Sequence, residues 1–342
     1  MKNSAVIRII RAAALSLLGV AALCSCDRIF EFEGDCSSVW KVDFRYDMNM
    51  KYADAFGHEA DAVTLYAFDQ DGTLVWQNTE QGDSLASEDY AMTLDLEPGV
   101  YDLVAWSCCD IAAEMFDLPA AEPLKASCDD LVCEMIRQKG TDGKSYVQSR
   151  LGSLMHGSID GLEITEAEGT HTVRMPMTKN TNEVRVILQH LSGEEIDPDS
   201  FAFSITDRNA AYSFDNTLLP CEEITYREWR KDSGHVGTGS DETRAVTSAS
   251  ALVAGITVGR LVQDNTPRLT VTNDKGETVI SIPLIDYALM IKGHYDSMSD
   301  QEYLDRQDEY NMTFFLDDDM HWMNTHIYIN SWKVVLSDVD FD

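Results

Sequence analysis

The sequence predicts an all-β protein with two tandem antiparallel β-sandwich domains that follow a lipoprotein signal peptide. Apolar and polar residues alternate with a period of two in many short segments, which is the pattern of half-buried strands. Several of these segments flank a glycine-containing turn of the kind that closes a β-hairpin. Both features recur in each half of the chain, so two packed-sheet domains are expected.

The chain begins like a secreted protein. Three basic residues come first: Lys2, Arg8 and Arg11. They precede the apolar run AAALSLLGVAAL at 12–23, which has the length of a signal peptide rather than of a membrane-spanning helix. The residues Leu-Cys-Ser-Cys that end at Cys26 resemble the bacterial lipobox, in which the last cysteine becomes the lipidated mature N-terminus. We expect a lipoprotein signal peptide over 1–25 and a diacylglycerol on Cys26. The alternative is a secreted protein in which Cys26 forms a disulfide.

An acidic segment at 26–37 is expected to tether the fold to the membrane. Its acidic residues are Asp27, Glu31, Glu33 and Asp35. They resemble the export signals that send lipoproteins of Bacteroidota to the outer surface, so we expect a lipid-anchored, surface-exposed protein of the cell outer membrane. The whole chain has 59 acidic and 26 basic residues and a net charge of −33. Such a charge repels phosphate backbones, which excludes nucleic acid as a partner.

The N-terminal domain is predicted over 38–170. Alternating segments predict five of its strands, at 39–48, 62–69, 73–77, 90–96 and 100–107. The second and third are expected to form a hairpin that turns at Gly72. The fourth and fifth are expected to form another hairpin, with Pro98 and Gly99 as its turn. Between 108 and 175 the periodicity fades into a mixed stretch.

The C-terminal domain is predicted over 171–342. Its strands are predicted at 171–191, 201–207, 268–284 (a hairpin turning at Asp274 to Gly276), 311–316 and 325–336. The segment 226–260 is rich in Gly, Ser and Thr and predicts a long loop with little core. Ser299 and Glu302 have the spacing of a helix start inside a helical insertion at 295–310.

Several segments together resemble the FimB-like minor fimbrial anchor subunit family of Bacteroidota. In the first half they are the lipobox, the following Cys-Ser-Ser, the strand that ends Tyr-Asp-Met-Asn-Met, and T-L-Y-A-F-D with D-G-x-L-V-W after it. In the second half they are T-K-N-T-N-E-V-R-V, IPLIDYALM (282–290), QEYLDRQDEYNMTFFL (301–316) and I-N-S-W-K-V (329–334). The resemblance runs across almost the whole mature chain.

This resemblance implies a type V pilus anchor, a non-enzymatic lipoprotein of two transthyretin-like β-sandwich domains that tethers a fimbria to the outer membrane and limits its length. Its implied partner is the major fimbrial (pilin) subunit, joined by β-strand complementation, in which a strand of one subunit fills a groove of its neighbour. Stalk subunits of such pili lose an N-terminal strand to an arginine-specific protease. Here Arg28 lies in the tether and Arg45 inside the first strand, which suits a subunit that keeps its first strand and terminates assembly.

The last segment, SWKVVLSDVDFD at 331–342, is the candidate for contact with the next subunit. Its predicted contact residues are Trp332, Val334, Leu336, Val339 and Phe341. The apolar residues of this segment fall on both faces of a strand, which is typical of a strand buried on both sides. The alternative is a last strand of the native domain followed by a frayed tail.

Six cysteines remain besides Cys24 and Cys26, at positions 36, 108, 109, 128, 133 and 221. Six cysteines allow 15 pairings, and an oxidising compartment permits them. Cys128 and Cys133 are the expected local disulfide because their spacing is short and the region is loop-like. The sequence contains no C-x-x-C pair, so neither a structural zinc site nor a thioredoxin-like site is expected.

Motifs for metal binding or catalysis are not found in the sequence. LDDDMHWMNTH at 316–326 gathers carboxylates and imidazoles: Asp317, Asp318, Asp319, His321 and His326. It lacks the spacing of a calcium loop and the H-E-x-x-H of a zincin, so we expect an acidic turn and no metal. G-x-S-x-G, G-x-G-x-x-G and Walker A motifs are absent from the sequence. We therefore expect no enzyme, no cofactor and no small-molecule substrate.

The competing function is a surface lipoprotein, an adhesin or tip subunit, that binds a glycan or another host ligand. Aromatic side chains would then stack on sugars, with Trp229, Trp322 and Tyr212 as candidates. Aromatic residues in strands more often belong to the core, so we prefer the fimbrial interpretation.

Overall fold

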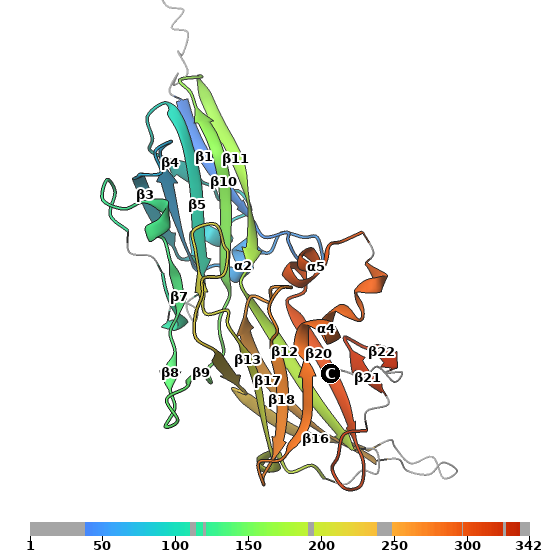
Figure 1. Cartoon of the computed structure of the whole chain (residues 1–342). Helices are drawn as coiled ribbons and strands as arrows, with labels where there is room; N and C mark the ends of the chain where they lie inside the picture. Colours follow the sequence, from blue (N-terminus) through green and yellow to red (C-terminus); the bar gives the residue numbers. More distant parts are fainter. Residues whose placement is uncertain are drawn as a thin grey trace, which may run out of the picture. The chain divides into compact units, whose positions relative to one another are not determined.

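The computed structural model describes residues 38–109, 114–118, 121–190, 195–237, 248–295, 297–323 and 326–335. The predicted signal peptide, Cys26, the tether and residues 336–342 lie outside the described residues. The described part consists mainly of β-strands arranged in several sheets, so the all-β prediction is confirmed (Figure 1). Each helix in this part of the chain is too short or too polar to span a lipid bilayer. The contacts discussed below lie within one compact unit formed by Trp40–Thr165 and His171–Asp342.

The first sheet has seven strands in the order β3, β2, β5, β10, β11, β1, β4. Their bounds are β1 (Ser38–Arg45), β2 (Ala62–Phe68), β3 (Leu74–Gln81), β4 (Met92–Leu94), β5 (Gly99–Cys108), β10 (Leu154–Ile164) and β11 (Gly169–Lys179). The inner strand β2 is buried on both faces, since Leu65 belongs to one hydrophobic cluster and Tyr66 to another. Two-sided burial explains why its sequence, AVTLYAF, is almost continuously apolar.

One of the two predicted N-terminal hairpins is confirmed and the other is wrong. β2 pairs with β3 across a turn in which Gly72 has a φ of 75°. β4 pairs with β1 instead of β5, while β5 pairs with β2 and β10. Gly99 belongs to β5, and a side chain there would come within 3.0 Å of the Tyr101 hydroxyl. That hydroxyl donates a 3.0 Å hydrogen bond to the Glu97 carbonyl oxygen, so P-G-x-Y forms a corner that leads into a strand.

Two further sheets share one hydrophobic cluster. The second sheet has the order β16, β17, β12, β20, β21, β22, and the third has the order β19, β18, β13, β15, β9, β8. The strands of the second sheet are β12 (Thr181–His190), β16 (Arg230–Gly237), β17 (Ser248–Gly259), β20 (Glu309–Leu316), β21 (His326–Ile329) and β22 (Trp332–Val335). Those of the third are β8 (Gln138–Lys139), β9 (Ser145–Val147), β13 (Phe201–Asp207), β15 (Ile224–Arg227), β18 (Arg268–Asn273) and β19 (Thr278–Pro283). Val186 of β12 and Phe203 of β13 both belong to the shared cluster, as expected for packed sheets.

The predicted loop over 226–260 is wrong, because this segment supplies a central strand. β17 pairs with β12 along ten residues, from Thr181 opposite Gly259 to His190 opposite Ser250. Its inward-facing side chains are fully buried: Leu252, Ala254, Ile256 and Val258. The positions between them are Val, Gly and Thr, so the Gly- and Ser-rich composition of the region obscures a period-two pattern.

The fourth sheet contains only short strands, in the order β14 (Ala211–Tyr212), β7 (Cys133–Met135), β6 (Phe116–Asp117). It draws β6 and β7 from the first half of the chain and β14 from the second. Likewise β9 pairs in parallel with β15 of the third sheet. A domain boundary at 170/171 would therefore place strands from the first half in sheets of the second, and the division into 38–170 and 171–342 stays a prediction.

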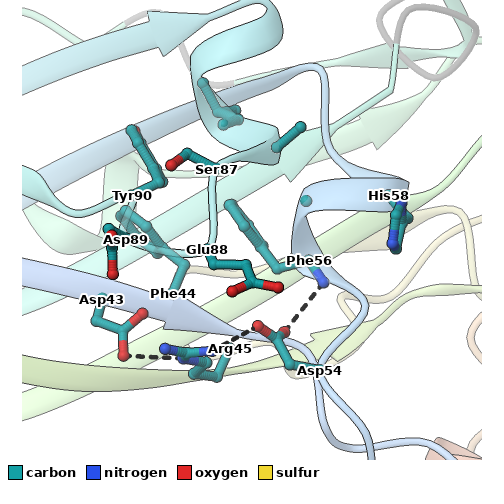
Figure 2. A pocket seen from close by; sticks show the side chains of 13 residues that line it. Asp43, Phe44, Arg45, Asp54, Phe56, His58, Ser87, Glu88, Asp89 and Tyr90 are labelled. Carbon is teal, nitrogen blue, oxygen red and sulfur yellow. Dashed lines mark hydrogen bonds and ion pairs between the residues drawn. The ribbon is translucent and has the colours of Figure 1, made fainter.

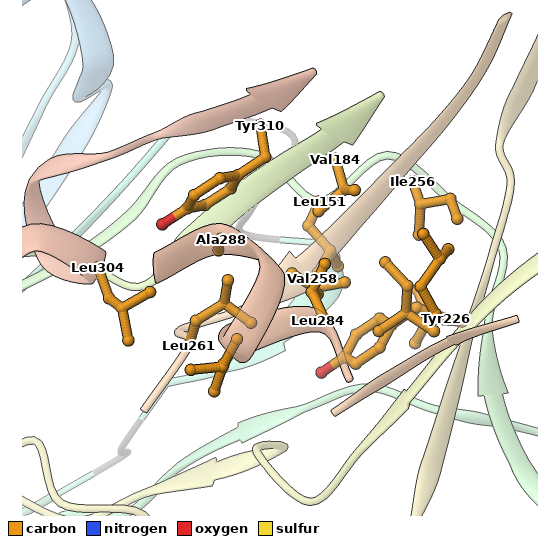
Figure 3. Packing of buried hydrophobic residues seen from close by; sticks show 14 of the residues in the cluster. Leu151, Val184, Tyr226, Ile256, Val258, Leu261, Leu284, Ala288, Leu304 and Tyr310 are labelled. Carbon is orange, nitrogen blue, oxygen red and sulfur yellow. The ribbon is translucent and has the colours of Figure 1, made fainter. Parts of the chain in front are cut away.

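Short helices lie in the connections between the strands. They are α2 (Phe56–Glu59), α4 (Leu284–Leu289), α5 (Asp300–Arg306), η1 (Asp83–Ala86), η2 (Cys128–Asp130), η3 (Pro198–Ser200) and η4 (Lys292–His294). The predicted start of α5 is confirmed, since Ser299 Oγ accepts a 3.0 Å hydrogen bond from the Glu302 N–H. Figure 3 shows Leu284 and Ala288 of α4 gathered with Tyr310 of β20 in the hydrophobic cluster.

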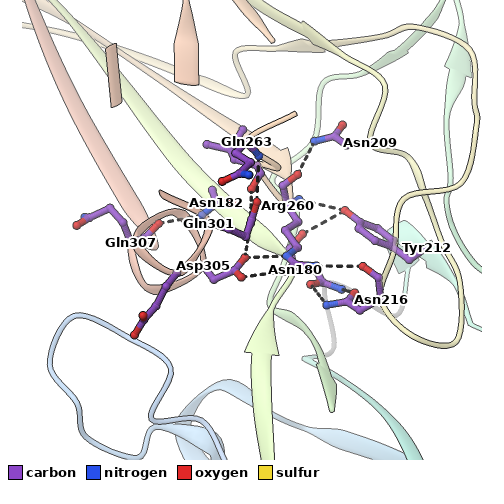
Figure 4. A network of polar contacts seen from close by, with 12 residues as sticks. Asn180, Asn182, Asn209, Tyr212, Asn216, Arg260, Gln263, Gln301, Asp305 and Gln307 are labelled. Carbon is purple, nitrogen blue, oxygen red and sulfur yellow. Dashed lines mark hydrogen bonds and ion pairs between the residues drawn. The ribbon is translucent and has the colours of Figure 1, made fainter. Parts of the chain in front are cut away.

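A buried polar network ties the end of β17 to α5 (Figure 4). Arg260 donates to both carboxylate oxygens of Asp305, at 2.7 and 2.8 Å, and to the Asn216 carbonyl oxygen at 3.0 Å. The Arg260 N–H also donates to the Tyr212 hydroxyl at 3.0 Å. Asn216 and Asn180 exchange side-chain hydrogen bonds of 2.6 and 3.1 Å. A two-bond arginine–carboxylate pair with a further hydrogen bond to a carbonyl oxygen holds these segments in one arrangement.

Candidate functional site

The first strand fills a position inside the first sheet. β1 lies between β11 and β4, and Val42 and Phe44 are 0% and 2% exposed. Tyr46, which follows the strand, is also buried. The alternation predicted for 39–48 is confirmed. The chain's own N-terminal strand therefore occupies the place that would be an open groove if β1 were removed.

Arg45, at the end of β1, is held by two carboxylates (Figure 2). Its Nε lies 2.9 Å from Asp43 and its Nη1 lies 2.9 Å from Asp54. The other oxygen of Asp54 accepts hydrogen bonds from the N–H groups of Tyr46 and Phe56, at 2.9 and 3.0 Å. Arg45 is therefore part of an ordered strand end, and its position differs from that of an arginine in an exposed processing loop.

A pocket of about 410 Å³ adjoins this end of β1. The rings of Phe44, Phe56 and Tyr90 stack against one another there, with centroids 5.4 Å apart for Phe44 and Phe56 and 6.3 Å apart for Phe44 and Tyr90. Glu88 and Asp89 line the same pocket as these rings (Figure 2). The stacked rings fix Phe44 and so hold β1 in its sheet.

The C-terminal segment forms a hairpin instead of the continuous strand predicted over 325–336. β21 and β22 are joined by Asn330 and Ser331, which have φ values of 46° and 71°. Two left-handed residues in succession give the tight turn that suits a two-residue hairpin. Asn330 also accepts a 2.7 Å hydrogen bond from the Asn311 N–H through Oδ1, and its own N–H donates to the Asn311 carbonyl oxygen at 2.9 Å. This reciprocal pair clamps the hairpin to β20.

The outer strand of this hairpin carries part of the predicted subunit contact. β22 is the last strand of the second sheet, and the side chain of Trp332 is 47% exposed. Val334 packs partly against the hydrophobic cluster. Leu336, Val339 and Phe341 lie outside the described residues. The structure thus brings Trp332 and Val334 together at a sheet edge, and their contact with a partner stays a prediction.

The predicted cysteine pair lies in the connection that enters the fourth sheet. Cys128 begins η2 and is partly buried, whereas Cys133 begins β7 and is fully buried. Both are thiols in this structure. Burial and the charge of Asp129 raise the pKa of Cys128, and burial raises the pKa of Cys133 strongly. A raised pKa keeps a thiol protonated and poorly reactive. The Cys128–Cys133 disulfide stays a prediction.

The acidic segment at 316–326 contains a turn organised by its first aspartate. Asp317 accepts hydrogen bonds from the N–H groups of Asp319 and His321, at 3.0 and 2.8 Å. Met320, between them, has a φ of 61°. Nowhere in the described part of the chain do three His, Cys, Asp or Glu side chains converge as a metal site would require. The carboxylate of Asp317 satisfies backbone donors, which is a structural role.

The three aromatic candidates for sugar stacking have different surroundings. Tyr212 is fully buried, so its interpretation as an accessible platform is wrong. Trp322 packs edge-on against Phe314 with centroids 5.5 Å apart. Trp229 is half-buried, and the guanidinium of Arg150 lies 5.6 Å above its ring. Both tryptophans are thus partly buried and packed against a neighbouring side chain.

Comparison with known proteins gives matches over most of the chain. The family model of fimbrillin-A associated anchor proteins Mfa1 and Mfa2 matches residues 32–338. The minor fimbrium anchoring subunit Mfa2 of Porphyromonas gingivalis is 24% identical over 228 residues, which are 64% of this chain and 66% of that protein. The alignment thus spans slightly less than two thirds of that relative's length.

Solved structures agree with this family match. A candidate adhesin from Bacteroides thetaiotaomicron superposes with a TM-score of 0.75 at 34% identity, covering 89% of this chain and 100% of that one. The fimbrial anchor protein Mfa2 from Porphyromonas gingivalis superposes with a TM-score of 0.63 at 18% identity, covering 88% and 100% of the two chains, and shows a shared fold. The resemblance to fimbrial anchor subunits is therefore confirmed, and the chain belongs to the family of fimbrillin-A associated anchor proteins Mfa1 and Mfa2.

Proposed function

We propose that this protein anchors a fimbria to the outer membrane through a lipid on Cys26, joins the adjoining pilin subunit by β-strand complementation, and limits fimbrial length. Membership of a family of fimbrial anchor proteins implies a structural, non-enzymatic role at the cell surface or outer membrane. The relative in Porphyromonas gingivalis is named for anchoring a minor fimbrium.

The single observation that carries the proposal is the position of β1. Strand complementation needs a groove in the receiving subunit, and here β1 fills the space between β11 and β4. The two ion pairs of Arg45 and the burial of Phe44 favour retention of this strand. A subunit with its own strand in place offers no vacancy at this point of the first sheet, so addition of further subunits stops there. This is the physical basis proposed for length limitation.

The strand offered to the pilin subunit is β22 with the residues that follow it. β22 is the last strand of the second sheet in the described part of the chain, and an edge strand can pair with a strand of another chain. The exposed side chain of Trp332 supplies apolar area on the same strand. Leu336, Val339 and Phe341 extend the apolar pattern. Main-chain hydrogen bonds would give affinity, and these alternate side chains would give specificity.

The finer fold assignment, two tandem transthyretin-like sandwiches, is part of the same proposal. It is supported by the sheet arrangement: one hydrophobic cluster lies on a face of the first sheet, and the second and third sheets share another cluster, to which Tyr66 and Trp106 of the first sheet also belong. The proposed boundary at 170/171 falls inside β11, which belongs to the first sheet, and β8 and β9 of the first half pair within the third sheet.

Deletion of residues 338–342 tests the strand assignment. The truncated chain should lose co-purification with the major pilin while its melting temperature stays the same, since the described core ends at Val335. The matched control is Lys125→Ala, at an exposed residue paired only with exposed Glu122. Unchanged co-purification of the truncated chain would exclude this segment as the contact.

Mass spectrometry of the mature N-terminus tests the anchor. A lipid-modified N-terminal Cys26 is expected, and Cys26→Ser should release the protein from membranes. An unmodified Cys26 in the wild-type protein would remove the membrane attachment from the proposal.

A further inference from the structure

We propose that the protein also binds a neutral carbohydrate, in a pocket of about 470 Å³ that is separate from β22 and is called here the polar pocket. The lining residues that matter are Glu59, Arg150, Lys179, Glu183, Arg185 and Thr257. They come from the end of α2, the segment before β10, the end of β11, and the strands β12 and β17. On β12, Val184 and Val186 face the core, so Glu183 and Arg185 point the other way.

The floor of the polar pocket holds a buried hydroxyl that has no hydrogen-bond partner among the described residues. Thr257 is 6% exposed, lines the pocket, and lies directly across from Glu183 in the β12–β17 pair. Buried hydroxyls in proteins almost always have a partner, and one without a partner lowers stability. A ligand hydroxyl that reached Thr257 Oγ1 would remove this penalty. The unpaired hydroxyl therefore points to a ligand that can donate or accept a hydrogen bond.

A second buried donor lies on the same face of β17. The Trp229 N–H donates a 3.0 Å hydrogen bond to the Gly255 carbonyl oxygen, and Gly255 is two residues before Thr257 on the strand. The indole Nε1 of Trp229 is buried and has no acceptor in the described part of the chain. Trp229 is not among the described residues that line the polar pocket, so it lies beside the pocket, and the hydroxyl of Thr257 is the unpaired group that faces a ligand.

The charges that line the polar pocket largely cancel. Lys179 Nζ lies 3.1 Å from Glu59. Arg185 contacts Glu183 at 2.9 Å and Glu309 at 2.7 Å. Burial raises the pKa of Glu59, but the charge of Lys179 and a hydrogen bond from Ser153 outweigh burial and hold this pKa below its ordinary value. The Glu59–Lys179 pair is therefore ionised at neutral pH. Because most of these charges are already paired with one another, a charged ligand would have to compete with an existing ion pair, which favours an uncharged one.

Arg150 supplies a planar surface at the rim of the polar pocket. Its side chain is 56% exposed, its guanidinium lies over the Trp229 ring, and its nearest carboxylate contact, with Glu183, is as long as 4.0 Å. The indole attracts the guanidinium through a cation–π contact. Its N–H groups remain able to donate in a fork to neighbouring hydroxyls. A sugar ring presents such adjacent hydroxyls.

The composition of the lining favours a carbohydrate over an extended peptide. Leu151 and Cys109 are its apolar side chains among the described residues, and a docked strand would need apolar pockets for alternate side chains. Hydroxyl groups both donate and accept, which matches a wall where ammonium, guanidinium and carboxylate groups alternate. The pocket volume of about 470 Å³ is within the range of small-ligand sites.

The test uses the purified full-length mature protein on an array of neutral and charged oligosaccharides, followed by titration calorimetry with the best neutral oligosaccharide. Thr257→Val and Arg150→Ala should each weaken that binding by about tenfold, the loss expected for one ligand hydrogen bond. Lys125→Ala, at an exposed ion pair outside the pocket lining, is the control and should bind as the wild type does. Thr257→Val should melt at the same or a higher temperature, because it removes an unpaired buried hydroxyl.

Three outcomes would overturn the proposal. They are an array on which no neutral oligosaccharide binds, binding restricted to sialylated or sulfated oligosaccharides, and neutral binding that neither variant weakens. A fall in the melting temperature of Thr257→Val would show that the hydroxyl is already bonded in the free protein and would count against it as well. These readouts do not involve fimbriae, so they succeed or fail independently of the anchoring function.

Discussion

The phenol of Tyr46, just after β1, donates a 2.6 Å hydrogen bond to the carboxylate of Asp308, just before β20. Nearby, Arg306 Nη1 donates to the carbonyl oxygen of Asp47 at 3.1 Å. Burial and the charge of Asp308 raise the pKa of Tyr46, so the phenol remains a donor at all physiological pH values. The first strand is thereby tied to the sheet that carries the C-terminal hairpin. For an anchor, this tie would carry force between the membrane side and the fimbrial side of the chain.

Tyr46→Phe should lower the free energy of unfolding by about 2 kcal/mol, because it removes a hydrogen bond to a partly buried carboxylate. Equilibrium denaturation in urea measures the change. Tyr101→Phe is the matched control, since the Tyr101 hydroxyl bonds an exposed carbonyl oxygen, and it should change stability by less than about 1 kcal/mol. Equal losses for the two variants would contradict the role given to the Tyr46–Asp308 contact.

Asp305→Ala should destabilise the protein by about 3–5 kcal/mol, because it leaves the guanidinium of Arg260 buried without its carboxylate. Thermal and denaturant unfolding both report this loss. Lys125→Ala, which breaks an ion pair whose side chains are 75% and 69% exposed, should cost less than about 1 kcal/mol. A mild effect of Asp305→Ala would mean that the network in Figure 4 contributes little to stability.

Asp207→Asn should stabilise the protein near neutral pH and lose that advantage in acid. Burial raises the pKa of Asp207 to about 6, although its Oδ1 accepts hydrogen bonds from the Arg208 N–H and from Asn265 Nδ2. Since the pKa in the unfolded chain is about 4, the protonated form contributes stability that is fully present below about pH 4. This contribution is lost as the pH rises through about 6.

The stability of Asp207→Asn relative to wild type should therefore increase by about 2–3 kcal/mol between pH 4 and pH 7. Denaturation curves of both proteins at several pH values give the difference directly. The contributions of the other carboxylates to stability are the same in both proteins and cancel in this difference. A difference that does not change with pH would show that Asp207 titrates normally.

Trp332→Ser should weaken capture of the major pilin without affecting the fold. The side chain is 47% exposed on the edge strand β22, so its loss should change the free energy of unfolding by no more than about 1 kcal/mol. Pull-down with the pilin and a melting curve are measured side by side. Capture at the wild-type level would remove Trp332 from the contact, whereas a large drop in melting temperature would assign it a structural role.

The sequence predicts the strands in which the alternation of apolar and polar residues is visible within the segment itself. β1, β2, β12 and β13 have a face of large apolar residues, so period-two alternation reveals them. β17 was missed because small residues separate its buried positions. β10 was missed because it contains polar residues and Gly157, whose position allows the close approach of Met175 and Met177.

The residues next to a strand do not show which other strand it pairs with, and they do not show which distant residues meet in a pocket. Pro98 and Gly99 lie between two alternating segments and so predict a hairpin, yet β4 pairs with β1 at the far edge of the sheet. The polar pocket unites Glu59, Arg150 and Thr257, which are far apart in the chain and individually unremarkable. The turn at Asn330 is the exception, since an Asn between two alternating runs is a recognisable signal for positive φ.

The central claim is that the chain holds a fimbria on the cell. The most direct measurement is the fraction of fimbriae found on cells and in the medium, with their lengths by electron microscopy, for a strain that lacks this protein. The account predicts that fimbriae are shed into the medium and are longer than in the wild type, and that the wild-type gene, but not Cys26→Ser, restores both properties. Cell-bound fimbriae of normal length in the deletion strain would contradict it.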